Sequence, residues 1–357
     1  MADPAYSATI LDVARLAKVS PSTVSHALNG KRPVGTATKE RIFSAIDSLG
    51  YIPSHSASHL RKGSSGIIGC YAIDITETFS NKIVRGIERG LVGSGLSMLF
   101  VSGVEFNNDF SRAYRFLLGH DIEGLLLCNH IPTIFDAFTA TKNSGIPVIS
   151  INMKLEGILS IFPDNYSGGM IAADHLYACG MRRPAMICGP ENRLSVQQRL
   201  KGFQGRVTDL GLEFASTHYM YGEFAYEQGY EAAFRLLQIN PRIDGIFCAN
   251  DYIAAGAINR LTEMGYKIPG DIRIIGFDDR DFSSFWHIPI STFEQPLEEM
   301  GFLGISALRC AISSPPAPPE SQILQSKLIA RTSTIGREAY KRLTEKSGAA
   351  QASQAAG

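Results

Sequence analysis

The sequence lacks the features that mark exported, membrane-spanning or disulfide-rich proteins. Asp3 and Asp12 fall where a signal peptide needs an unbroken apolar segment, and no later run reaches the roughly 18 apolar residues that cross a bilayer. The six cysteines include no C-x-x-C pair, and four of them sit in apolar runs, which is typical of reduced core residues. We therefore expect a cytoplasmic protein without membrane attachment.

Motifs of the common enzyme classes are also missing. The eight histidines form no H-E-x-x-H motif, and the sequence contains no G-x-S-x-G and no P-loop. The first expected strand-to-helix turn has no G-x-G-x-x-G pattern either. We therefore expect a protein that is not an enzyme and that has no cofactor and no bound metal.

Net charge is zero for the whole chain, but the N-terminal part is basic. Residues 1–62 hold eight basic and four acidic side chains, so this end carries about +4 and the remainder is correspondingly acidic. A small basic module on a larger acidic body favours a polyanion as the partner of the module. A solvated basic face would have the same composition.

The N-terminal 50 residues have the spacing of three short helices. Thr9 and Asp12 form a capping-box pattern at the start of the first helix, and Ser20 precedes a second helix whose first residue is Pro21. The third helix, in "TATKERIFSAIDSLG", stops at Gly50. Its predicted apolar face consists of Ile42, Phe43, Ile46 and Leu49. These residues predict one small all-α unit.

The second predicted helix is too polar for a core helix. Val24 and Leu28 keep the spacing that would hold it against its neighbours, while the other positions carry hydroxyl groups and His26. A polar helix face beside a basic module favours contact with something other than a protein core.

After a serine-rich linker, short apolar runs alternate with amphipathic helices from Gly66 onward. Runs such as "GIIGCYAID", "EGLLLCN", "RPAMICG" and "DGIFCAN" are typical of parallel strands covered by helices. About eight such units exceed one open sheet, and a break around "EGILSIFPDNYSGG" divides them into two sets of four. The sequence therefore predicts an α/β body of two doubly wound parallel-sheet lobes with a cleft between them. A single eight-stranded barrel is the alternative.

Eight phrases, in order, resemble the lactose-repressor (LacI/GalR) family of bacterial transcription regulators. They include "TILDVARLAKVSPSTVSHALNGKRPV", "PDNYSGG", "QQRLKGF", "ANDYIAAGAI" and "IPGDIRIIGFDD", and they extend from Thr9 to about Thr334. The resemblance implies a helix-turn-helix headpiece on a body like the periplasmic binding proteins. It also implies a regulator, more often a repressor, that binds a near-palindromic operator as a homodimer and responds to a small effector such as a sugar, a polyol or a nucleoside-like molecule. The alternative is a solute-binding protein of the same two-lobed fold without a DNA function.

The resemblance also implies a division of the chain. The headpiece is expected at residues 1–52, a hinge helix and linker at 53–65, and the effector-binding and dimerisation body at 66–337. Within the body, the expected N-lobe is 66–163 with 294–320, and the expected C-lobe is 164–293 with 321–337; residues 338–357 are expected to form a disordered tail.

The expected DNA contacts come from the second helix and from the hinge. In a helix-turn-helix the second helix lies in the major groove, and the family's hinge helix places a leucine in the minor groove. His26, in "TVSH", stands where most of the family has arginine and where the purine-repressor subgroup has histidine. The implied DNA-binding residues are Ser20, Ser22, Thr23, Ser25, His26, Asn29, Leu60 and Arg61.

The expected effector site lies at the carboxyl ends of the body's strands, which face the cleft in an open parallel sheet. The resemblance adds a polar clamp from "QQRL" and "GFDD" and two aromatic walls. Arginine and aspartate side chains suit the hydroxyl groups of a polyol. The implied effector-binding residues are Asp74, Phe79, Asn129, Arg193, Ser195, Arg199, Phe224, Asn250, Asp278 and Gln295.

Overall fold

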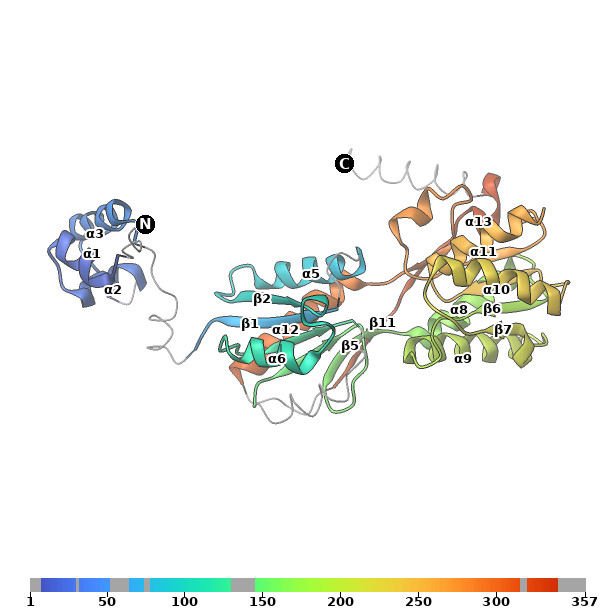
Figure 1. The fold of residues 1–357 in the computed structure, drawn as a ribbon, viewed down its shortest axis with the longest axis horizontal. Helices are drawn as coiled ribbons and strands as arrows, with labels where there is room; N and C mark the ends of the chain where they lie inside the picture. The colour runs from blue at the N-terminus through green and yellow to red at the C-terminus, as the bar shows by residue number, and fades with distance from the viewer. Residues whose placement is uncertain are drawn as a thin grey trace, which may run out of the picture. The chain divides into compact units, whose positions relative to one another are not determined.

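Two separate units make up the chain, Met1–Gly66 and Ile67–Gly357, each with its own buried core (Figure 1). The computed structural model describes residues 8–29, 32–51, 64–73, 78–129, 145–314 and 320–339. The described residues of the first unit form three helices, as predicted: α1 (Ile10–Ala17), α2 (Pro21–Asn29) and α3 (Thr36–Leu49).

Local sequence signals set the starts of the first two helices. Asp12 accepts a hydrogen bond from the backbone N–H of Thr9 at 3.0 Å, which closes the predicted capping box of α1. The Ser20 hydroxyl accepts one from the backbone N–H of Thr23 at 3.1 Å and so caps α2. The three helices bury one small core, made of Val13, Ala14, Ala17, Val24, Ala27, Ile42 and Ala45.

One predicted core position of the headpiece is wrong. Phe43 is 41% exposed, whereas its neighbour Ile42 is fully buried. Successive residues of a helix point about 100° apart, so the face that buries Ile42 and Ala45 turns Phe43 toward solvent. Ile46 and Leu49 are partly buried against the core, as predicted.

The N-lobe of the body is built on a parallel sheet with helices on both faces. In spatial order its strands are β11 (Gln322–Leu324), β5 (Leu159–Pro163), β4 (Val148–Ile151), β3 (Leu125–Cys128), β1 (Ile67–Ala72) and β2 (Ser97–Ser102). Its helices are α5 (Thr78–Leu91), the short 3-10 turn η1 (Val104–Phe106), α6 (Phe110–Leu118) and α12 (Leu297–Ser313). Helices α5 and α12 pack together on one apolar cluster of the sheet, and α6 packs on another.

The C-lobe has a smaller parallel sheet. In spatial order its strands are β7 (Tyr219–Met220), β6 (Pro184–Ile187), β8 (Gly245–Cys248) and β9 (Arg273–Ile275). Its helices are α8 (Asn165–Ala178), α9 (Leu194–Asp209), α10 (Tyr226–Ile239), α11 (Asp251–Glu263) and α13 (Thr332–Ile335), with 3-10 turns η2 (Ser216–His218) and η3 (Asp281–Ser284). Helix α9 packs closely on α8 because Gly202 has no side chain: a Cβ there would lie 2.0 Å from the Tyr166 carbonyl oxygen.

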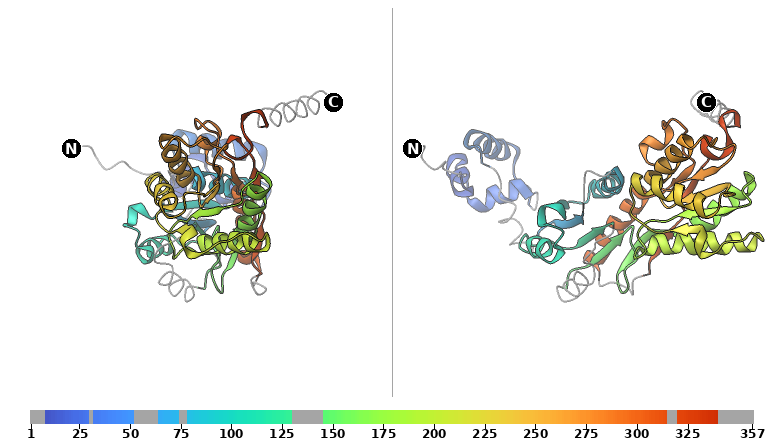
Figure 2. Two further views of the ribbon diagram at one scale, coloured as in Figure 1. Left: turned by 90° about the vertical axis from the view of Figure 1, so that its right-hand side faces the viewer. Right: turned by 45° about the vertical axis from the view of Figure 1, so that its right-hand side comes forward.

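The described chain passes between the lobes three times (Figures 1 and 2). It leaves the N-lobe after β5, returns after β10 (Thr292–Glu294) to enter α12, and leaves again after β11 toward β12 (Lys327–Ile329). Strands β10 and β12 pair with each other in an antiparallel ribbon. These three crossover segments connect the N-lobe to the C-lobe.

The two doubly wound lobes are confirmed, and the barrel alternative is wrong, because the body has separate sheets. The predicted two sets of four strands are also wrong: over the described residues the N-lobe sheet has six strands, and the C-lobe sheet has four beside the β10–β12 ribbon. The expected C-lobe segment 321–337 starts too early, since Gln322–Leu324 pairs with β5. Strand β5 lies in the segment "EGILSIFPDNYSGG" that was expected to be a break between the two sets of strands. Its neighbour β11 and the strand β10 have three residues each, so their local pattern is too short to assign them to a sheet.

The expected tail, residues 338–357, is described only at its first two residues. Residues 337–339 are helical and follow Gly336, whose φ of 78° breaks the chain away from α13. Residues 340–357 lie outside the described part of the chain.

Candidate functional site

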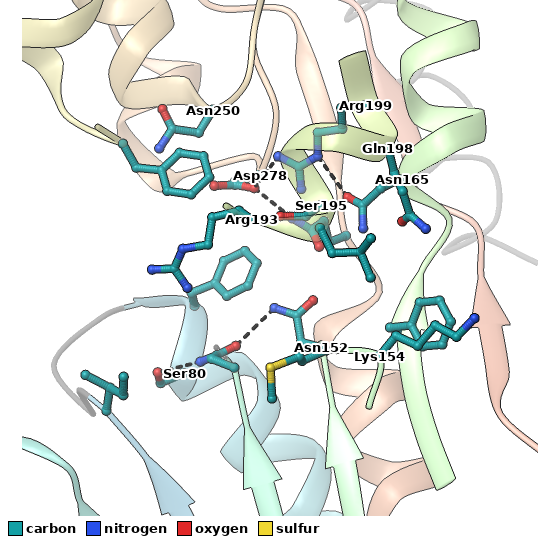
Figure 3. Close-up of a pocket in the computed structure, with 18 of the residues that line it drawn as sticks. Ser80, Asn152, Lys154, Asn165, Arg193, Ser195, Gln198, Arg199, Asn250 and Asp278 are labelled. Carbon is teal, nitrogen blue, oxygen red and sulfur yellow. Dashed lines mark hydrogen bonds and ion pairs between the residues drawn. The ribbon is translucent and has the colours of Figure 1, made fainter. Parts of the chain in front are cut away.

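A cavity of about 430 Å³ lies between the two lobes of the body (Figure 3). Carboxyl ends of strands, the first turns of α5, α9 and α11, and the crossover after β10 form its walls. Asp74 lies outside the described residues. The other predicted effector residues all line the cavity: Phe79, Asn129, Arg193, Ser195, Arg199, Phe224, Asn250, Asp278 and Gln295.

Arg199 is a buried cation in the C-lobe wall. It is 5% exposed; its Nε donates to Asn165 Oδ1 at 2.8 Å, and its Nη1 donates to the Ala249 carbonyl oxygen at 2.5 Å. The guanidinium also lies 3.6 Å from the ring centroid of Phe277. Burial lowers the pKa of Arg199 to about 10, while the carboxylate of Asp278 acts in the opposite direction. The side chain therefore stays charged at neutral pH and is held rigidly.

Asp278 completes a polar clamp with Arg199 and with the crossover residue Gln295. One carboxylate oxygen of Asp278 accepts from Gln295 Nε2 at 2.7 Å and lies 4.0 Å from Arg199 Nη1. The backbone of Asp278 has a φ of 110°, which L-residues rarely adopt, and its N–H donates to the Phe293 carbonyl oxygen. Three segments distant in sequence, α9, the loop after β9 and the end of β10, thus meet at one carboxylate.

The N-lobe wall carries a chain of amide groups. Asn152 Nδ2 donates to Asn129 Oδ1 at 3.0 Å, and Asn129 Nδ2 donates to Ser80 Oγ at 3.0 Å (Figure 3). Asn129 and Asn152 follow the adjacent strands β3 and β4, both with left-handed backbone (φ 64° and 65°). Amides and hydroxyls in this arrangement match the hydrogen-bonding groups of a polyol.

Asn250, Phe224 and Ser195 have different roles in shaping the C-lobe wall. Asn250 Oδ1 accepts from the backbone N–H of Ile253 at 2.9 Å, so it caps α11 while it lines the cavity. The Phe224 ring packs against Gly189. A Cβ at position 189 would lie 2.3 Å from this ring, so the contact requires glycine there. Ser195 stands in the first turn of α9.

The α2 face of the headpiece has the predicted polarity. Val24 and Ala27 are buried, Ser22 is exposed, and Thr23, Ser25 and His26 are partly exposed. The Ser20 hydroxyl is within 2.7 Å of the Ser22 hydroxyl and 2.8 Å of the Thr23 hydroxyl, so it serves the cap. Asn29 ends α2, but its side chain, Leu60 and Arg61 lie outside the description.

Comparisons with known proteins match both units. Residues 9–54 match the profile "Bacterial regulatory proteins, lacI family", and residues 173–334 match the "Periplasmic binding protein-like domain". The transcriptional repressor PurR of Haemophilus influenzae is 31% identical over 84% of this chain and 90% of its own length. This chain belongs to the LacI family. It is a DNA-binding transcriptional regulator with the α/β body of that family.

Other LacI-family proteins are similar over almost the whole chain. The ribose operon repressor of Escherichia coli is 31% identical over 86% of this chain and 94% of its own length. The crystal structure of the lac repressor dimer bound to operator and the anti-inducer ONPF has a TM-score of 0.81 and 26% identity, and covers 93% of this chain and 100% of that one. The similarity therefore includes headpiece and body together.

Sequence reasoning missed several residues of the LacI-family cleft. Asn152 follows its strand as Asn129 does, so the strand-end rule could have identified it. Arg280 comes two residues after Asp278 and lies 5.6 Å from the Phe79 ring centroid and 4.9 Å from that of Tyr252. Nothing in the local sequence indicates that this loop turns back across the cleft. The other missed lining residues include Ser80, Lys154, Asn165, Gln198 and Tyr252.

The described residues form neither a metal site nor a membrane-spanning helix. No group of three or more His, Cys, Asp or Glu side chains there is arranged to hold a metal ion. None of the described helices is long and apolar enough to cross a membrane.

A buried carboxyl behind the clamp predicts a pH dependence of stability. Asp251 is fully buried and accepts hydrogen bonds from the Arg280 N–H, the Ser283 hydroxyl and the Thr292 hydroxyl. Burial, followed by the nearby Asp278 carboxylate, raises the pKa of Asp251 to about 7. The folded chain thus binds this proton more tightly than the unfolded chain does. Raising the pH from about 4 to about 7 should remove on the order of 4 kcal/mol from the free energy of unfolding.

Urea unfolding at pH 5 and pH 7.5 measures this contribution. The Asp251→Asn variant, which has no titrating carboxyl at this position, should lose less stability over that interval than the wild type. Asp209→Asn, at an exposed carboxylate, is the control and should keep the wild-type pH dependence. Equal losses in all three proteins would contradict the assignment.

Proposed function

We propose that this LacI-family protein is a repressor that binds a near-palindromic operator as a homodimer and is controlled by a sugar-like effector in the interlobe cleft. The observation that carries the proposal is the clamp of Arg199, Asp278 and Gln295 at the crossovers. A ligand held there contacts the C-lobe and a crossover segment at once, so its binding energy depends on the angle between the lobes. Occupancy would then shift the population of lobe arrangements and with it the affinity for the operator.

The chemistry of the cleft supports a hydroxyl-rich effector, either a sugar or a nucleoside-like molecule. Carboxylate, guanidinium and amide groups line it from both lobes, with Phe79 and Phe224 as aromatic walls. Such walls suit the apolar face of a ring, while the polar groups bind its hydroxyls. The relative named as the ribose operon repressor supports this ligand class.

For the DNA side, we propose that α2 reads the major groove with Ser22, Thr23, Ser25 and His26. Val24 and Ala27 fix the helix to its core, so the opposite face is presented on a rigid support. Leu60 and Arg61 are proposed to contact the minor groove from each subunit of the dimer. The lac repressor dimer on operator supports the two-subunit arrangement.

Replacing His26 tests this reading mode. His26→Ala should weaken binding to the operator by about 10-fold for each half-site, because one base-edge hydrogen bond is lost per subunit. The operator would be selected from random DNA with the wild-type protein, and affinities measured by gel-shift titration. His120→Ala, an exposed histidine of the body, serves as the matched control. Unchanged affinity and sequence preference in the His26 variant would contradict the proposed role.

Two other classes compete with this proposal. A solute-binding protein would share the two lobes but would have no use for a separate helical unit with a polar α2 face. A sugar-modifying enzyme would be established by turnover of a candidate sugar in the presence of the protein. Residues 9–54, which match the family's regulatory domain, favour the regulator over both.

A further inference from the structure

The walls of the cleft carry more positive than negative charge. Of the described residues that line it, Lys154, Arg193, Arg199 and Arg280 are basic, and Asp278 is the only acidic one. Arg199 is held by Asn165 and Ala249 as part of the wall. A neutral polyol does not require such an excess of cations.

Among these basic residues, Arg193 has the environment that most favours binding of an anion. Burial lowers the pKa of its guanidinium, and the exposed Glu223 counteracts this only in part. Among the described residues, no carboxylate forms an ion pair with Arg193 within 4.0 Å. A half-buried cation is stabilised most by an anion that contacts it directly. A bound carboxylate or phosphate would be such an anion.

The helix that starts at Arg193 adds to this preference. Helix α9 is 16 residues long, and its N-terminal residues Arg193, Leu194 and Ser195 line the cleft. Arg193 is the N-cap residue, and its side chain makes no capping hydrogen bond. The first backbone N–H groups of α9 and the positive end of its dipole are therefore placed at the cleft wall, where they favour an anion.

Gln295 points independently to a ligand in the same cavity. Its side chain is 4% exposed, and Nε2 donates to Asp278, but its Oε1 has no hydrogen-bond partner within the described structure. A buried amide oxygen left in this state is unfavourable, so it calls for a donor from the ligand. A sugar hydroxyl supplies this donor.

We propose that the effector is an anionic sugar whose carboxylate or phosphate binds Arg193 and the first turn of α9 and whose hydroxyl donates to Gln295 Oε1. The inference rests on the effector role proposed above and narrows it to one ligand class. A cavity of about 430 Å³ is in the size range of small-ligand sites and has room for a monosaccharide with a charged substituent.

Inorganic phosphate is the first probe, because it tests the anion subsite without knowledge of the sugar. At constant ionic strength, replacing chloride by phosphate should raise the Tm of the full chain by about 2–4 °C. This rise should disappear in Arg193→Gln and persist in Arg183→Gln, an exposed arginine of the same lobe. No rise in the wild type, or an undiminished rise in Arg193→Gln, would overturn the inference.

Matched sugars then identify the source of the anion. The Tm of the full chain would be measured with glucuronate, with glucose 6-phosphate and with glucose. A larger rise with glucuronate than with glucose identifies a carboxylate as the bound anion, and a larger rise with glucose 6-phosphate identifies a phosphate. A stronger effect of glucose overturns the inference. Gel shifts with operator DNA separate the two proposals. If an anion binds without changing operator affinity, the subsite stands and the effector role fails. If only neutral sugars change operator affinity, the effector role stands and the anion preference fails.

Discussion

Deleting residues 1–62 should abolish specific operator binding and leave ligand binding unchanged. The headpiece helices bury their own core, and the body beginning at Ile67 has separate cores in both lobes, so each unit keeps its packing without the other. Loss of the proposed reading helix α2 should cost at least about 10³-fold in operator affinity. Ligand affinity should stay within about two-fold of that of the full chain.

Two measurements on the same preparations check this result. Gel shifts with the selected operator compare the full chain with the 63–357 fragment, and a thermal-shift screen of sugars, sugar acids and nucleosides compares their ligand binding. Operator binding retained by the fragment would refute the assignment of DNA reading to α2. A fragment that unfolds at the temperature of the assay would contradict the independence of the body.

Arg199→Met should destabilise the body by about 3–5 kcal/mol and eliminate effector binding. Methionine keeps most of the volume but removes the donors to Asn165 and Ala249, and it removes one of the two cations within 4.0 Å of the Asp278 carboxylate, the other being Arg280. The loss is large because Arg199 is 5% exposed, so water cannot replace these interactions.

Urea unfolding of the full chain measures this loss. Lys201→Met, an exposed position on the same helix, is the control and should change the free energy of unfolding by about 0.5 kcal/mol or less. The double variant Arg199→Met with Asp278→Asn should be more stable than Arg199→Met alone, because it removes a buried carboxylate that has lost one of its two cations. If Arg199→Met costs no more than the control, Arg199 does not hold the clamp together.

Much of the fold follows from short-range patterns in the sequence. The capping box at Thr9 and the Ser20–Pro21 pair set the helix starts, and long apolar runs locate the central strands β1, β3, β4, β6 and β8. Strand β5 was missed, because its segment was interpreted as the break between the lobes. The edge and crossover strands β10 and β11 were missed as well. They are three residues long, and their positions depend on pairing with β12 and β5.

The candidate site was predictable to the extent that strand ends define it. Asn129 and Asp278 follow strands and line the cleft, as that rule expects. The rule does not show which of these side chains also form hydrogen bonds with the backbone. Asn250 is one of them, because its side chain caps α11. Arg280 could not be assigned, because its place beside Phe79 results from the turn at Asp278 and from the packing of two lobes.

The position of β11 has a consequence for synthesis on the ribosome. The edge of the N-lobe sheet comes from Gln322–Leu324, and α12, which covers that sheet, comes from Leu297–Ser313. The C-lobe sheet and its four long helices are complete once Ile275 has emerged. During vectorial translation the four-stranded sheet of the C-lobe can therefore form before the N-lobe sheet is complete, and α13 joins the C-lobe afterwards. The first lobe waits for nearly the whole chain, with an unpaired strand edge exposed until β11 arrives.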